Sequence, residues 1–145
     1  MSLFDNSLAM RTLDMLERGM DAQTLRRQVI ADNIANVDVP HFKRSEVIFE
    51  AAMKRAVDEQ RALSEPRLEM RTSSPNHIAR PAPRGFDQAV PHRVVDYSSS
   101  MRNDGNNVDI ENEVAELTRN QLHYSLLVDR FGGTYRQLNQ LLRMA

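Results

Sequence analysis

The 145-residue chain contains no cysteine and no tryptophan, and only 6% of its residues are aromatic. Without cysteine, neither a disulfide nor thiolate chemistry is available to it. Hydrophobic residues make up 41% of the chain, which is enough to bury a helical seam but little for a deep globular core. We therefore expect one domain at most, with an elongated shape.

A surplus of charge of either sign is also missing. Lys and Arg number 19 against 20 Asp and Glu, for a net charge of −1. The balance holds separately in residues 1–44, 45–105 and 106–145. No part of the chain offers the basic surface that nucleic acid or an anionic membrane requires. We expect neither as a partner.

Long hydrophobic runs are absent as well. No stretch approaches the 18 or so consecutive apolar residues of a membrane-spanning helix. The first residues lack a basic segment followed by an apolar one, so we expect no cleavable signal peptide.

The last third of the chain carries an apolar heptad with alternating spacings of four and three residues. Nine of its ten positions are apolar, which predicts a long helix that needs a coiled-coil-like partner. The positions are Ile110, Val114, Leu117, Gln121, Tyr124, Val128, Phe131, Tyr135, Leu138 and Leu142.

The N-terminal third repeats this spacing over a predicted helix at residues 5–37, with Asp5, Asn6 or Ser7 as its cap. A second apolar stripe, with Ala22 and Val29, lies on the opposite side of this helix. A helix that is apolar on two sides needs two neighbours, which predicts assembly with other chains. The first seam consists of Ala9, Leu13, Leu16, Met20, Gln23, Arg27, Ile30, Ile34 and Val37.

The two seams also predict how the long helices align. If the helices are antiparallel and the numbers of paired residues add up to about 147, Arg27 faces Asn120 and Gln121. The polar interruptions of both seams then fall in one layer, and such a layer specifies register.

The middle of the chain reads differently from its ends. Residues 45–63 predict one shorter helix, whereas the Pro-rich residues 64–107 predict an irregular, partly mobile excursion with a hint of extended chain at Val94 and Val95. Asn107 or Asp109 can cap the last helix. We therefore predict an all-α, elongated fold with three segments, residues 1–37, 38–107 and 108–145.

Two glycines, Gly132 and Gly133, interrupt the heptad helix at a cost of about 1 kcal/mol each relative to alanine. Because the heptad continues beyond them, we do not expect the helix to end there. Either a neighbouring backbone approaches closely or the helix bends, and we favour close approach.

No catalytic or metal site is indicated. The four histidines, His41, His77, His92 and His123, are too dispersed for a zinc site. Glu116 and His123 share a helix face but lie about 10 Å apart along it, too far for joint acid–base work. We expect no cofactor and no enzymatic activity.

Three stretches resemble segments of one known family. Residues 27–43 read RQVIADNIANVDVPHFK and are similar to the N-terminal signature of bacterial flagellar axial proteins, commonly written ANNIANxxTPGYK. Residues 68–78, LEMRTSSPNHI, resemble a central element of the proximal rod subunits, and residues 104–111, DGNNVDIE, resemble the start of their C-terminal helix. The resemblance runs nearly end to end. The length and the segment QLHY at 121–124 fit the B-type branch of this rod family.

The signature is matched at Asn33, Ile34, Asn36, Pro40 and Lys43. It departs where Val39 stands for Thr, His41 for Gly and Phe42 for Tyr. Since His lacks the easy positive φ of Gly, we expect the turn after Pro40 to differ in detail. Asn33, Asn36 and Pro40 are interpreted chiefly as a helix stop, with inter-subunit hydrogen bonding as a second role.

The resemblance implies a structural subunit of the proximal rod, the drive shaft that crosses the periplasm. It implies export through the flagellar type III apparatus without a cleaved signal. The implied partners are other rod subunits and the adaptor at the rod base, with self-assembly into a helical tube. The alternative from another class is a soluble coiled-coil adaptor or export chaperone.

We expect the seam residues to form the assembly interface, so that Leu117→Asp or Ile34→Asp blocks rod assembly. The alternative is that the two seams form only the core of a helical hairpin within one chain. The predicted interface residues are Leu13, Leu16, Met20, Arg27, Ile30, Ile34, Val37, Val114, Leu117, Gln121, Tyr124, Val128, Phe131, Tyr135, Leu138 and Leu142.

Overall fold

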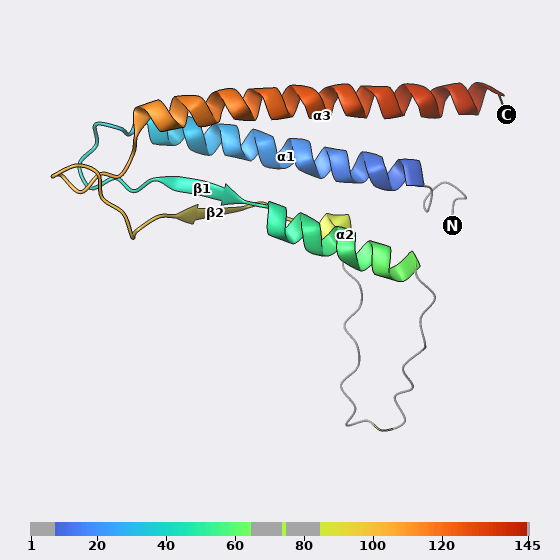
Figure 1. Cartoon of the computed structure of the whole chain (residues 1–145), viewed down its shortest axis with the longest axis horizontal. Coiled ribbons are helices and arrows are strands. Elements are labelled where there is room, and N and C mark those ends of the chain that lie inside the picture. Colours follow the sequence, from blue (N-terminus) through green and yellow to red (C-terminus); the bar gives the residue numbers. More distant parts are fainter. Residues whose placement is uncertain (1–7, 65–73, 75–84, 145) are drawn as a thin grey trace.

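The computed structural model describes residues 8–64, 74 and 85–144. Two long helices, α1 (Leu8–Ala35) and α3 (Ile110–Met144), run antiparallel and side by side (Figure 1). The predicted pair of long terminal helices is confirmed, and the fold is mostly α. The proposed caps at residues 5–7 and the 68–78 element, apart from Ser74, lie outside the described residues.

The ends of both long helices follow local signals. Helix α1 ends at Ala35, where the Asn36 side chain donates to the Asp32 carbonyl at 2.7 Å. Asp109 caps α3, because its Oδ1 accepts the amide of Glu111 at 3.0 Å. Both predictions are confirmed.

The predicted helix over 45–63 is wrong at its start. Residues Ser45–Ile48 form strand β1, which pairs antiparallel with β2 (His92–Val95), and α2 begins only at Glu50 and runs to Ser64. Side chains in β1 alternate between buried and exposed, the pattern of a strand with one covered face. The helical spacing came from residues that belong to α2. The extended chain suspected at Val94 and Val95 is confirmed as part of β2.

Helix α1 lies between α3 on one side and the β1–α2 layer on the other (Figure 1). Ala22, from its second stripe, is fully buried in a cluster with Phe49, Ala56 and Ala89. The inference that one chain could not cover both sides of α1 is therefore wrong. Strand β1 and the short 3-10 helix η1 (Phe86–Gln88) supply the second neighbour, and α2 joins them through Ala56.

The described part of the middle segment is not a free excursion. Residues after β2 fold back onto the turn that follows α1, and Asn106 and Asn107 are buried there. Asn106 Nδ2 donates to the carbonyls of Asn36, Val37 and Val39 at 2.9–3.1 Å. This order was missed because polar side chains create it and leave no apolar pattern.

The turn after Pro40 keeps a left-handed residue although glycine is absent. His41 adopts φ 61° and its amide donates to the Asp104 carbonyl at 3.0 Å. Histidine adopts a positive φ less easily than glycine, and His41 adopts it nonetheless. The surrounding hydrogen bonds hold a conformation that a non-glycine residue rarely adopts.

Helix α3 continues through Gly132 and Gly133. A Cβ atom added to either glycine meets no atom within 4 Å. We favoured close approach by a neighbouring backbone, and no part of the described chain approaches either glycine in this way. The close approach occurs instead at Gly19 on α1, where an added Cβ would lie 3.4 Å from Leu127.

Candidate assembly surface

The side of α3 that faces α1 is not the predicted heptad seam but an edge of it. The most buried residues of α3 are Glu113 and Asn120, at 0% and 4% exposure, and Leu127 lies against Gly19. Each stands one position before an exposed seam residue, namely Val114, Gln121 and Val128. Of the seam residues, four lie on the side of α3 that faces α1. Leu117, Phe131 and Leu138 are half-buried there, and Tyr124 is 41% exposed.

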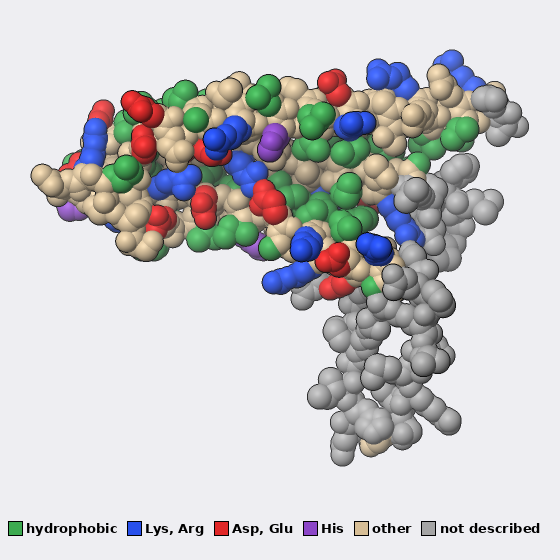
Figure 2. Space-filling model, viewed as in Figure 1, with side chains coloured by type: hydrophobic (Ala, Val, Ile, Leu, Met, Phe, Trp, Pro, Cys, Tyr) green, Lys and Arg blue, Asp and Glu red, His purple; other side chains and the backbone are tan. Residues whose placement is uncertain are grey.

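The remaining half of the seam is uncovered. We call Val114, Gln121, Val128, Tyr135 and Leu142, spaced by seven residues, the outer seam; all five are exposed. Figure 2 shows hydrophobic side chains at intervals along the surface of α3. An exposed apolar line of this length on a helix marks an interaction surface.

Two further residues, Leu122 and Leu126, form a second exposed patch, 120–160° around the helix from Val128 by the usual 100° per residue. It is α3, rather than α1, that is apolar on sides with no neighbour. The large apolar residues of α3 with 41–66% exposure are Ile110, Val114, Leu122, Tyr124, Leu126, Val128, Tyr135, Leu141 and Leu142.

The predicted interface residues of α1 have a different place. Leu13, Leu16 and Ile30 are buried within the single chain. Met20, Ile34 and Val37, the last just beyond the helix, are half-buried, whereas Arg27 is exposed. The buried three stabilise the chain itself, because their apolar surface is already removed from water.

A polar layer joins the two long helices, but the partner of Asn120 is Gln23, about one turn before the predicted Arg27. Asn120 Nδ2 donates to the Gln23 carbonyl at 3.1 Å and to its side-chain oxygen. Arg27, Asn120 and Gln121 line one groove with Gln23. The antiparallel register is therefore confirmed to within about one helical turn.

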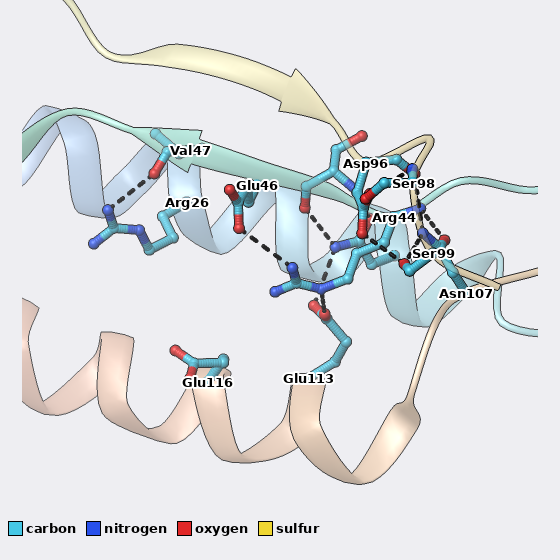
Figure 3. Close-up of polar contacts among 12 residues, drawn as sticks. Arg26, Arg44, Glu46, Val47, Asp96, Ser98, Ser99, Asn107, Glu113 and Glu116 are labelled. Atoms are coloured by element: carbon cyan, nitrogen blue, oxygen red, sulfur yellow. Dashed lines mark hydrogen bonds and ion pairs between the residues drawn. The ribbon is translucent and has the colours of Figure 1, made fainter. Parts of the chain in front are cut away.

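A buried polar cluster, the Glu113 anchor, joins α1, β1 and α3. It comprises Glu113, Arg44, Asn33 and Ser45, and Figure 3 shows Arg44 reaching from the start of β1 to Glu113 on α3. Asn33 Nδ2 donates to the Ser45 carbonyl at 2.8 Å and to Glu113 Oε2 at 3.1 Å, and its Oδ1 accepts the Ser45 amide at 3.0 Å. Every buried side-chain polar atom in the described chain has a partner.

The charges of the anchor support one another. Burial by itself lowers the pKa of Arg44, but the hydrogen bond and negative charge of Glu113, with Glu46 beside them, raise it above its usual value. Arg44 therefore stays protonated. Sequence reasoning missed both Arg44 and Glu113, because the helix dipole alone favours an acidic residue in a first helical turn and nothing local marks Glu113 as buried.

The other motif residues also bond within the chain. Lys43 Nζ donates to the carbonyls of Ser99 and Gly105 at 2.9 and 2.8 Å, which connects the segment before β1 to the loop after β2. That loop is itself held by Asp96, whose carboxylate accepts hydrogen bonds from the hydroxyls of Ser98 and Ser99 and from the Ser98 amide; these bonds lower the pKa of Asp96 well below its usual range. Pro40 is exposed. The polar groups of Asn33 and Asn36 thus have partners without a second subunit.

The described residues contain no group of three or more His, Cys, Asp or Glu side chains arranged to hold a metal ion. None of the helices in that part of the chain is long and apolar enough to cross a membrane.

The chain folds as a pair of long helices, and one of them keeps an exposed apolar line. These features are typical of a structural subunit that packs against its neighbours through its helices. Comparison with known proteins supports this class. Residues 13–43 match the sequence model of the flagella basal body rod protein family. This match covers most of α1 and the signature turn up to Lys43.

Three relatives match over nearly the whole chain. The flagellar basal body rod protein FlgB of Borrelia hermsii is 38% identical over 143 residues, which is 99% of this chain and 100% of that protein. FlgB of Borreliella burgdorferi is 38% identical over 92% of this chain and 96% of its own, and FlgB of Bacillus subtilis is 30% identical over 98% and 97%. The chain belongs to the FlgB family of flagellar basal body rod proteins.

Proposed function

We propose that this chain is a structural subunit of the proximal rod of the bacterial flagellar basal body, where it helps to transmit motor torque. The observation that carries the proposal is the outer seam of α3. A family of rod proteins needs long surfaces by which subunits pack, and this chain has such a surface left open after folding.

The size of the surface is adequate for assembly. The nine exposed apolar side chains of α3 lie on the outer seam and on other sides of the helix, and each would contribute on the order of 1 kcal/mol when a neighbouring subunit covers its exposed half. Association and side-chain ordering offset part of that gain. A contact spread over most of a helix about 52 Å long resists twisting without any chemical step.

The partners we propose are other rod subunits, copies of this chain among them, and the adaptor at the rod base. The location we propose is the basal body where the rod crosses the periplasm, reached by flagellar type III export. These details rest on the family, to which relatives of nearly full length assign the chain.

The outer seam can be tested separately from folding. Val128→Asp and Tyr135→Asp place a charge on exposed positions, so the isolated proteins should keep the wild-type circular dichroism and unfolding midpoint. In cells that carry either variant as the only copy, we expect no swimming and no protein in isolated basal bodies. His123→Asp is the matched control, because it adds a charge to an exposed residue on another side of α3.

Wild-type swimming by both seam variants would overturn the proposal. The variants Leu117→Asp and Ile34→Asp are less informative, since both residues are half-buried in the chain and their loss also destabilises the monomer. The rival function, a soluble adaptor or export chaperone, predicts a stable monomer or small dimer that does not co-purify with basal bodies.

A further inference from the structure

The groove between α1 and α3 contains a positive charge without an acidic partner. The groove has a volume of about 510 Å³ and is lined by Gln23, Thr24, Arg27, Asn120, Gln121, Tyr124 and Ser125. None of the ion pairs among the described residues includes Arg27, whose side chain is exposed. We call this surface the Arg27 groove.

The other donors in the Arg27 groove suit a carboxylate. The hydroxyls of Thr24 and Ser125 already donate to backbone carbonyls of their own helices. The Gln121 amide and the Tyr124 hydroxyl lie beside Arg27, and both can donate to an anion. A carboxylate that enters the groove would gain a charge-assisted hydrogen bond from the guanidinium.

Helix α3 carries an acidic residue suited to this role. From Leu117 to its end, α3 contains a single acidic residue, Asp129, among four arginines. Asp129 is exposed and belongs to no ion pair within the described residues. It follows Leu126 by three residues and Leu122 by seven, so these three side chains share one helix face. The carboxylate is therefore flanked by the second exposed apolar patch.

We propose that the α3 face with Leu122, Leu126 and Asp129 docks over the Arg27 groove of a second copy, so that Asp129 of one copy pairs with Arg27 of the next. This inference rests on the proposed function, since it specifies one contact by which rod subunits meet. The leucines would cover the exposed parts of Tyr124 and Val128 beside the groove.

The geometry of this contact leads to a helical assembly. Because the two surfaces occupy different places on the molecule, the contact is heterologous, and such contacts repeat from copy to copy. Asn33 contacts Glu113 and Gly19 contacts Leu127, so residues that face each other across the two helices have numbers that add up to about 146. Arg27 is therefore level with about Arg119, and Asp129 lies about ten residues farther along α3. Parallel copies joined in this way are displaced along the helix axis by about 15 Å.

A charge swap tests the pairing in the complete rod. Arg27→Asp and Asp129→Arg each bring like charges together, so each should reduce the amount of protein in isolated basal bodies by more than about tenfold. The double variant restores the opposite charges and should recover incorporation and swimming. Arg130→Asp, an exposed charge reversal next to Asp129, is the control and should incorporate normally.

The outcomes separate this inference from the proposed function. Normal incorporation of either single variant would overturn the pairing. Loss without recovery in the double variant would also overturn it, because the acid in the groove would then belong to another rod protein. Neither result affects the outer-seam test with Tyr135→Asp, because Tyr135 lies outside the proposed contact.

Cross-linking tests the contact directly, because the chain has no cysteine of its own. An Arg–Asp pair holds its Cα atoms farther apart than the roughly 7 Å that a disulfide allows, so a short bis-maleimide is used in place of oxidation. Residues 27 and 129 of one chain lie about 15 Å apart along the helix axis. Arg27→Cys combined with Asp129→Cys should give a ladder of covalent multimers when basal bodies are treated with this reagent, whereas either cysteine alone should give no ladder. Monomers only from the double variant would overturn the proposal.

Discussion

Glu113 is a carboxylate that the fold has placed where an apolar residue would be expected. Its side chain has no exposure, and it contacts Arg44 from the start of β1 and Asn33 from α1. Removing an ion pair from water costs free energy, so such a pair specifies an arrangement more than it adds net stability. Here the arrangement is the position of the first turn of α3 against the end of α1.

Removing the Glu113 carboxylate should destabilise the chain substantially. Glu113→Ala leaves Arg44 partly buried without its main partner, and we expect a loss of about 2–3 kcal/mol in the free energy of unfolding. Urea unfolding followed by circular dichroism measures the loss. Glu116→Ala, which removes a surface pair with Arg119 one turn along the same helix, should cost less than about 0.5 kcal/mol. Equal losses in the two variants would contradict the role of the anchor.

At the scale of the element, α3 combines two functions on neighbouring sides. One side, with Glu113, Asn120 and Leu127, faces α1 and fixes the position of the helix. The adjacent side, the outer seam, stays open. The predicted heptad runs along the border between the two sides, since a stripe of residues spaced four and three apart is wide enough to contribute to both.

Gly132 and Gly133 can be tested as features of α3. An added Cβ meets nothing within 4 Å at either position, so Gly132→Ala with Gly133→Ala should stabilise the isolated chain by about 1–2 kcal/mol through helix propensity. Thermal unfolding of the purified protein measures the gain. Gly19→Ala, in the interior of α1, should gain about 1 kcal/mol, because its Cβ would make ordinary contact with Leu127 at 3.4 Å. A loss of stability in the double variant would show that the glycines have a structural role within the chain.

At the scale of the molecule, α1 is shared by two packed layers. It contacts α3 on one side and, through Ala22, the cluster with Phe49 and Ala56 on the other. The Glu113 anchor further joins β1 to α3. The two layers therefore cannot lose their packing independently.

This arrangement predicts a single unfolding transition. The chain lacks tryptophan, so Phe86→Trp introduces one fluorescent reporter into the α2 side of the molecule. Its fluorescence in urea should change with the same midpoint as the circular dichroism signal, which is dominated by the long helices. Tyr97→Trp, in an exposed position, should report only a small change. Two separate midpoints would show that the layers unfold independently.

Much of the fold was accessible from the sequence, and the reasons are local. Heptad spacing, the Asp109 cap and the Asn36 stop each depend on neighbours within a few residues along the chain. Strand β1 was missed because its conformation depends on pairing with β2, more than 40 residues away. The candidate site was predicted as a seam, but its division into a covered edge and an open edge was not.

By itself, the sequence determined two long antiparallel helices, their register and an apolar line suited to assembly, because periodicity and capping act over short distances. Only the tertiary structure decided which helix is left with an open side. The second stripe of α1 is covered by β1, η1 and, through Ala56, α2. Asn33 donates a hydrogen bond to Glu113, and Asn120 donates to Gln23, so Glu113 and Asn120 both face α1. Asn33 and Gln23 are polar and distant in sequence from Glu113 and Asn120, so the apolar pattern of the sequence does not predict these contacts. The resulting orientation of α3 leaves Val114, Val128 and Tyr135 facing outward.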